Sequence, residues 1–88
     1  RNRAICILHH GYKCKICDFS FDKKYGNLGN NFIEVHHLTP LSKIKKNHIV
    51  DPINDLIPLC SNCHSMIHRN NQLMSPEDLK SIIINENK

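Results

Sequence analysis

The stretch that decides the fold is LIPLCSNCHSMIH, residues 56–68. Its first four residues are apolar, which predicts a short strand, and Pro58 confines that strand to a sheet edge or a bulge because proline donates no backbone hydrogen bond. The pattern becomes helical from Cys60, with Ser61 or Asn62 as the cap, and continues to about Arg69. The stretch therefore predicts a strand followed by a helix that carries cysteines and histidines.

Two C-x-x-C pairs form the clearest metal-binding pattern, and they consist of Cys14, Cys17, Cys60 and Cys63. Thiolates at this spacing can bind one tetrahedral zinc at about 2.3 Å, and four of them leave no open coordination position. We therefore expect a structural zinc that stabilises a chain able to bury only about 60% of its unfolded surface. The alternatives are buried free cysteines or two disulfides. Cys6 is predicted to be a small buried residue without a role in the site.

Four histidines form a second pattern. His64 and His68 stand four residues apart on the predicted helix, about 100° from the direction of Cys63, so one helix can serve two sites. His36 and His37 are neighbours on a predicted strand and therefore point to opposite faces. If His36 joins the helix pair, three nitrogens make a metal site with open positions, and His37 is free to act as a base. The alternative is a set of incidental surface histidines.

The rest of the chain predicts few further elements. We expect a helix over residues 1–10, a knuckle over 12–17, mostly loop over 18–31 and a strand over 32–38. A last helix begins with Ser75 as cap and presents Leu79, Ile82 and Ile83 on one face. No repeat or linker divides the sequence, so residues 1–88 are predicted to form one domain, which we expect to be part of a longer protein.

Composition and charge favour a soluble protein that binds a polyanion. The longest apolar runs are too short for a membrane span, and no signal-peptide pattern follows the basic start. Five cysteines, four of them in metal-type pairs, suit a reducing cytoplasm better than a disulfide framework. Nine of the 12 Lys and Arg but only three of the eight Asp and Glu precede residue 51. This basic first half is a plausible nucleic-acid footprint, with a solvated surface as the alternative.

The segments EVHHLTPL (residues 34–41) and DPINDLIPLCSNCHSMIH (residues 51–68) resemble the HNH endonuclease signature. The resemblance runs from about residue 11 to residue 69. It is closest to the nuclease domain of modification-dependent restriction endonucleases, in which two zinc-binding C-x-x-C pairs bracket the signature. It implies a small α+β fold: a ββα-metal (His-Me finger) core of two antiparallel strands and a helix around one divalent ion, with a structural zinc knuckle and flanking N- and C-terminal helices.

The resemblance also implies roles for individual side chains. His36, His64 and His68 match ligands of the catalytic ion, which could be Mg, Mn, Ni, Co or Zn, and His37 matches the general base that activates water. Glu34 occupies the acidic position of the E-x-H-H form. We expect it to support a ligand or orient the substrate, with a solvated strand residue as the alternative.

One position departs from the family pattern. The central Asn of the signature falls on Asp55, with Asn54 one residue early, and either could brace the segment that carries the base. Three lysines follow the paired histidines and are predicted to contact phosphates, although a solvated loop is a fair alternative; these are Lys43, Lys45 and Lys46.

These implications describe a metal-dependent DNA endonuclease that leaves 5′-phosphate and 3′-hydroxyl ends. We expect a restriction or mobile-element enzyme of the prokaryotic cytoplasm that acts on double-stranded, possibly modified DNA. Recognition would then reside in another domain of the parent chain, and double-strand cleavage would favour a homodimer. The alternative function is a catalytically silent zinc module that binds DNA or a protein. A zinc peptidase is a weaker candidate, because the chain contains no H-E-x-x-H pattern.

Overall fold

The computed structural model of the chain describes residues 1–38, 49–69 and 74–88. The elements in chain order are α1 (Asn2–His10), α2 (Phe21–Tyr25), the 3-10 turn η1 (Gly26–Gly29), β1 (Glu34–His37), β2 (Leu56–Leu59), α3 (Ser61–Ile67) and α4 (Pro76–Glu86). The two strands are antiparallel, with His36 opposite Ile57 and His37 opposite Leu56. Two antiparallel strands followed by a helix confirm the predicted small α+β fold and fit a ββα-metal core.

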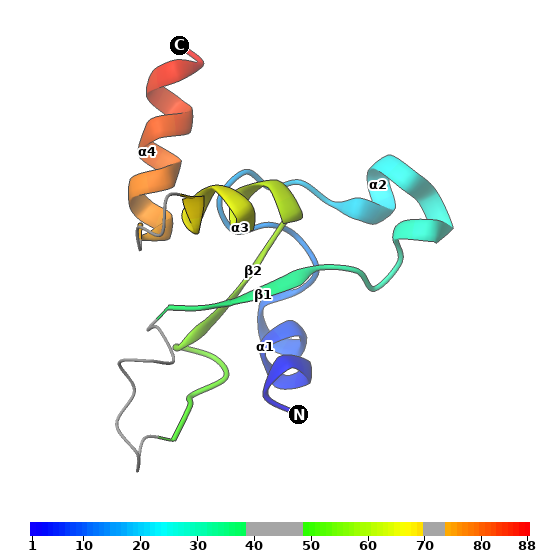
Figure 1. Ribbon diagram of the computed structural model, residues 1–88. Coiled ribbons are helices and arrows are strands. Elements are labelled where there is room, and N and C mark those ends of the chain that lie inside the picture. Colours follow the sequence, from blue (N-terminus) through cyan, green and yellow to red (C-terminus); the bar gives the residue numbers. More distant parts are fainter. Residues whose placement is uncertain (39–48, 70–73) are drawn as a thin grey trace.

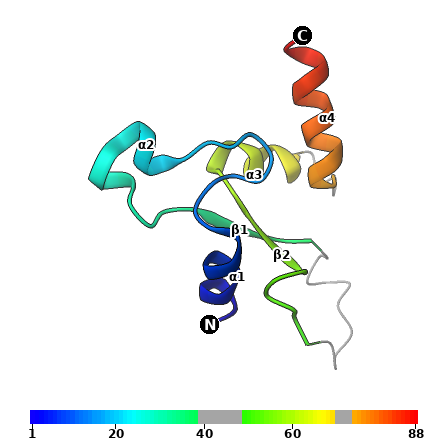
Figure 2. The same cartoon turned by 180° about the vertical axis from the view of Figure 1, so that it is seen from behind.

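The two strands separate α1 from α3, as both views of the molecule show (Figures 1 and 2). Helix α1 packs against β2, α3 contacts both strands, and α4 packs against α3. The short elements α2 and η1 project to one side of this core (Figure 1). None of the helices in the described ranges combines the length and apolar character needed to cross a bilayer. The arrangement places α3 directly over the strand that carries the paired histidines.

The hydrophobic core is built around cysteines. Its buried members come from the knuckle, β2, α3 and α4, and they are Cys14, Ile16, Leu59, Cys60, Cys63, Ile67 and Leu79. Ser75 caps α4 as predicted, because its hydroxyl accepts a hydrogen bond from the Asp78 amide at 3.1 Å. The predicted apolar face of α4 is only partly packed, since Leu79 is buried whereas Ile82 is 45% exposed. The cysteines thus join the knuckle to the start of α3 within the core.

The segment over residues 18–31 differs from the predicted loop, because it contains α2 and η1. The Phe21 ring packs edge-on against Phe19 and Phe32, with centroid distances of 4.9 Å and 4.7 Å. Gly29 approaches the backbone of Phe21 so closely that a Cβ atom there would overlap its carbonyl. Aromatic packing stabilises this helical turn, and a residue without a side chain at position 29 lets the backbone come this close. The turn shows no apolar periodicity in the sequence.

Two element boundaries also differ from the predictions. The N-cap of α3 is Cys60, rather than Ser61 or Asn62, and its sulfur accepts a hydrogen bond from the Cys63 amide at 3.4 Å. Strand β1 is shorter than the predicted span of residues 32–38. A cysteine can serve as the cap here because the turn that brings the C-x-x-C sulfurs together also aims the first sulfur at the helix amides.

Candidate functional site

The first candidate site is the four-cysteine cluster. The sulfurs of Cys14, Cys17, Cys60 and Cys63 lie within 4.8 Å of one another. The Cys17 and Cys60 sulfurs are 3.7 Å apart. All five cysteines are free, so the alternative of two disulfides is wrong for this structure, and Cys6 is fully buried as predicted. The knuckle and the start of α3 therefore converge on one point in space.

The thiols of this cluster have an environment that suits a bound cation. Burial raises the pKa of Cys63, and hydrogen bonding with Cys60 raises it further. Burial also acts to raise the pKa of Cys14, but backbone hydrogen bonds, led by that of Cys17, outweigh it and lower the pKa. Four thiolates gathered in a low-dielectric core need a compensating positive charge. This donor set suggests a structural zinc, for which four sulfurs are a complete ligand shell.

The second candidate site is the three-histidine cluster, formed by His36 of β1 and by His64 and His68 at α3. The three ring centroids are separated by 5.0 to 5.4 Å. One ligand nitrogen from each ring lies within 4.8 Å of the others. Cys63 and Ile67 on the same helix are buried in the core. The structure therefore confirms that one helix presents cysteine to one cluster and histidine to another.

His36 provides the strongest indication that the histidine cluster can hold a cation. Its side chain is buried, and its Nδ1 atom has no hydrogen-bond partner among the described residues. Burial lowers the pKa of His36 to about 4, and the neighbouring His64, His68 and His37 lower it in the same direction. The ring is therefore neutral at physiological pH and has a lone pair available. Three clustered imidazoles with coordination positions left open suggest a catalytic metal site.

Glu34 connects β1 to the histidine cluster. One carboxylate oxygen accepts a hydrogen bond from Nδ1 of His64 at 2.8 Å, and the other accepts one from the Ser61 hydroxyl at 2.7 Å. These hydrogen bonds, that of His64 first, lower the pKa of Glu34. Glu34 is thus more than a solvated strand residue. No sequence pattern marks Ser61 as a site residue, because its contact with β1 depends on how the helix lies over the strand.

His37 and the two candidates for the central Asn position lie outside the histidine cluster. His37 is half-buried and follows His36 on the strand, so it points to the other face. The Asp55 carbonyl accepts a hydrogen bond from the Leu38 amide at 2.8 Å, and its carboxylate accepts one from the Asp51 amide at 2.8 Å. Asn54 donates its side-chain amide to the Asp51 carboxylate at 2.7 Å. Of the two, Asp55 is therefore the one bonded to the segment that follows His37.

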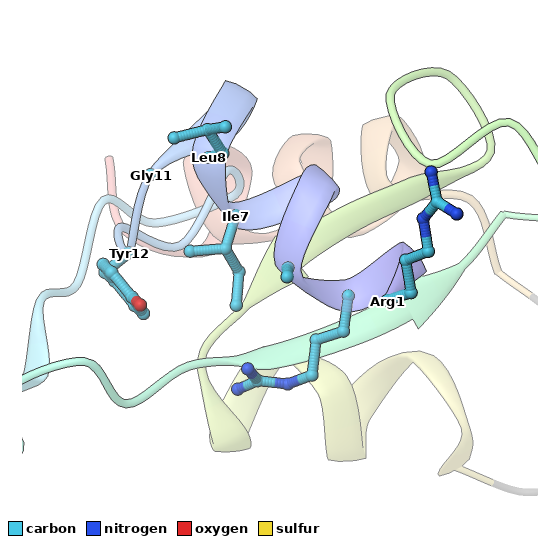
Figure 3. A pocket seen from close by; sticks show the side chains of 7 residues that line it. Arg1, Ile7, Leu8, Gly11 and Tyr12 are labelled. Atoms are coloured by element: carbon cyan, nitrogen blue, oxygen red, sulfur yellow. The ribbon is translucent and has the colours of Figure 1, made fainter.

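Two further features are the predicted phosphate contacts and a cavity beside α1. The predicted phosphate contacts Lys43, Lys45 and Lys46 lie outside the described residues. A cavity of about 550 Å³ lies beside α1 (Figure 3), and its lining residues are Arg1, Arg3, Ala4, Ile7, Leu8, Gly11 and Tyr12. None of these residues belongs to either cluster. The chemistry-bearing side chains are therefore gathered around α3 rather than in this cavity.

Comparison with known proteins assigns the chain to a family. A family model described as HNH endonuclease matches residues 14–70, which include all four clustered cysteines and all three clustered histidines. No curated protein and no solved structure gave a significant match. Because the matched region is well over half of the 88 residues, the chain belongs to the HNH endonuclease family.

Proposed function

We propose that this chain is a metal-dependent DNA endonuclease domain that leaves 5′-phosphate and 3′-hydroxyl ends. The observation that carries the proposal is the three-histidine cluster, in which the buried Nδ1 of His36 has no partner among the described residues. Membership of the HNH endonuclease family supports the reaction class. Three nitrogen ligands leave coordination positions open for substrate, as a catalytic site requires.

The roles of the side chains follow from their positions. His36, His64 and His68 would hold the divalent ion, such as Mg, Mn, Ni, Co or Zn. When bound, this ion would stabilise the negative charge that develops on the phosphate and on the leaving 3′ oxygen. His37 accepts the proton of the attacking water as general base. Its position on the other face of β1 leaves its ring free of the ligand set.

Asp55, rather than Asn54, takes the place of the central Asn in this proposal. The main chain of Asp55 is bonded to Leu38, directly after His37, whereas the Asn54 amide is turned to Asp51. The Asp55 carboxylate also fixes the turn by accepting the Asp51 amide. Asp55 thereby positions the segment that carries the base through its main-chain carbonyl, while its carboxylate holds the turn as an acceptor without needing an amide N–H.

A finer assignment concerns the biological setting of the domain. The paired C-x-x-C motifs around E-x-H-H support a restriction or mobile-element nuclease of the modification-dependent type, with double-stranded, possibly modified DNA as substrate. The four cysteines would bind a structural zinc.

Base recognition would come from another domain of the parent protein, and two copies of the chain would cut both DNA strands. Plasmid cleavage as a function of methylation tests the substrate, and analytical ultracentrifugation on DNA tests the homodimer.

The central test is plasmid nicking in Mg, Mn, Ni or Co with the wild type and His37→Ala. Loss of a general base should slow cleavage about 10² to 10⁴-fold, while the metal content stays unchanged. His9→Ala is the matched control, because His9 is an exposed histidine of α1 outside the cluster. Undiminished cleavage by His37→Ala would refute the assigned base. A wild type that binds DNA but cuts with none of the four ions would instead be a silent zinc module.

The lysines between the strands provide an independent test of the DNA partner. Replacing Lys43, Lys45 and Lys46 by Ala should weaken duplex binding and reduce the slope of log K against log salt by about 0.9 per lost phosphate contact. Lys80→Ala, an exposed change on α4, is the control. Fluorescence anisotropy over a range of salt concentrations measures both slopes. An unchanged slope in the triple variant would mean that these three lysines do not contact phosphate.

A further inference from the structure

We propose that Ser61 and Glu34 are positioning residues that fix the tautomer and orientation of His64. The inference rests on the proposed function, in which the three-histidine cluster holds a divalent ion. It goes further by assigning a role to Ser61, a residue outside both clusters, and by linking the two clusters through the first turn of α3.

The hydrogen bonds of Glu34 determine which nitrogen of His64 can act as a ligand. A carboxylate carries no proton and can only accept, so the 2.8 Å contact from Nδ1 of His64 requires the proton on Nδ1. In the neutral ring the lone pair is then on Nε2, the other ring nitrogen. A carboxylate bonded to the far nitrogen of a histidine fixes the ring and raises its basicity as a metal ligand.

Ser61 determines how firmly Glu34 can perform this task. The Glu34 and His64 side chains are 38% and 25% exposed, and an isolated pair with that exposure is weakly ordered. The Ser61 hydroxyl donates to the second carboxylate oxygen at 2.7 Å, so both oxygens are held at once. With its second oxygen released, the carboxylate could rotate away from the His64 ring.

The position of Ser61 links this arrangement to the four-cysteine cluster. Ser61 is the first residue of α3 and directly follows Cys60, which is both the helix cap and a member of that cluster. A cation bound by the cysteines would therefore fix the backbone that carries the Ser61 hydroxyl. His68 differs from His64, because neither of its ring nitrogens makes a hydrogen bond with residues 1–38, 49–69 or 74–88. The positioning acts on one ligand of the three.

The test compares Ser61→Ala, Ser61→Thr and Glu34→Ala with the wild type. Ser65→Ala is the control, since Ser65 is an exposed serine of the same helix. Each protein is loaded with zinc, checked for zinc content and thermal melting, and titrated with Ni²⁺ by calorimetry. Glu34→Ala should weaken Ni²⁺ binding about 10- to 100-fold, and Ser61→Ala, one contact further away, about 3- to 10-fold. Ser61→Thr, which keeps the hydroxyl, should restore most of the affinity.

Two-bond ¹H–¹⁵N NMR of the zinc-loaded protein without Ni²⁺ reads the tautomer directly. His64 should be protonated on Nδ1 in the wild type and shift toward the Nε2–H form in Ser61→Ala and Glu34→Ala. Wild-type affinity together with a wild-type tautomer in Ser61→Ala would overturn the proposal. A wild type that binds no Ni²⁺ beyond its zinc would contradict the proposed function, and the NMR comparison would still decide the positioning role.

Discussion

The four-cysteine cluster and the three-histidine cluster use the same short helix but face different surroundings. Cys60 and Cys63 are 4% and 5% exposed within the core, whereas His64 is half-buried and His68 is exposed. Four sulfurs complete a tetrahedron, while three nitrogens leave positions open. The difference indicates two separate roles for α3, in which the buried side stabilises the fold and the accessible side carries the site proposed for catalysis.

The strongest test of this division removes one cysteine. Cys60→Ser should lose about one zinc per chain and most of the folded structure, because a structural zinc of this kind contributes on the order of 10 kcal/mol to folding. Circular dichroism melting and zinc analysis measure the two effects. Cys6→Ala is the matched control, since Cys6 is buried but lies outside the cluster. If Cys60→Ser bound as much zinc as the wild type and melted at the same temperature, the four-cysteine cluster would not stabilise the fold.

A smaller effect is expected from the histidine side of the helix. His68→Ala should slow DNA cleavage about 10³-fold, because a direct ligand should cost more than the 10- to 100-fold typical of its outer partners. The exposure of His68 means that the melting temperature and the cysteine-bound zinc should change little. Cleavage assays and calorimetry with the divalent ion measure the loss. If His68→Ala unfolded the chain as Cys60→Ser is expected to, the two sides of α3 would not have separate roles.

The members of both clusters that lie on or next to α3 could be predicted from the sequence, because their spacing follows from helix geometry. Cys60 and Cys63 lie within one helical turn, and His64 and His68 are four residues, or about one turn, apart. Because each residue turns the helix by about 100°, the residue order alone predicts that the two histidines point in a different direction from Cys63. Alternation along the strand likewise separates His36 from His37, and only His36 joins the cluster. Local backbone periodicity was sufficient for these directions, whereas the approach of Cys14, Cys17 and His36 to the helix was expected from metal-ligand chemistry and the family resemblance.

The features that escaped prediction depend on contacts between elements. The hydrogen bond from Ser61 to Glu34 arises from the way α3 lies over β1, and no local pattern around Ser61 indicates it. The turn α2 is stabilised by Phe21 packing against Phe19 and Phe32 rather than by its own propensity. Cys60 serves as cap although capping preferences favour its neighbour. Tertiary packing decided each of these outcomes.

The smallest expected effect concerns protonation of His36. Burial lowers its pKa from about 6.5 to about 4, so between these values the unfolded chain binds more protons than the folded one. The neutral, buried His36 therefore adds to the free energy of unfolding, and this contribution is complete above pH 6.5. It amounts to at most about 3 kcal/mol and is lost as the pH falls toward 4. Melting of wild type and His36→Gln from pH 5 to 7 should show a steeper pH dependence for the wild type.

NMR titration of His36 in zinc-loaded protein without a second ion separates this effect from acid release of zinc by the thiols. The ring should remain neutral down to about pH 5, because its depressed pKa lies about one unit lower. Titration near the ordinary histidine value would show that water reaches the ring. His36 would then share the accessible surroundings of His68, and the histidine cluster would lack the buried, neutral ligand that distinguishes it from a surface group of histidines.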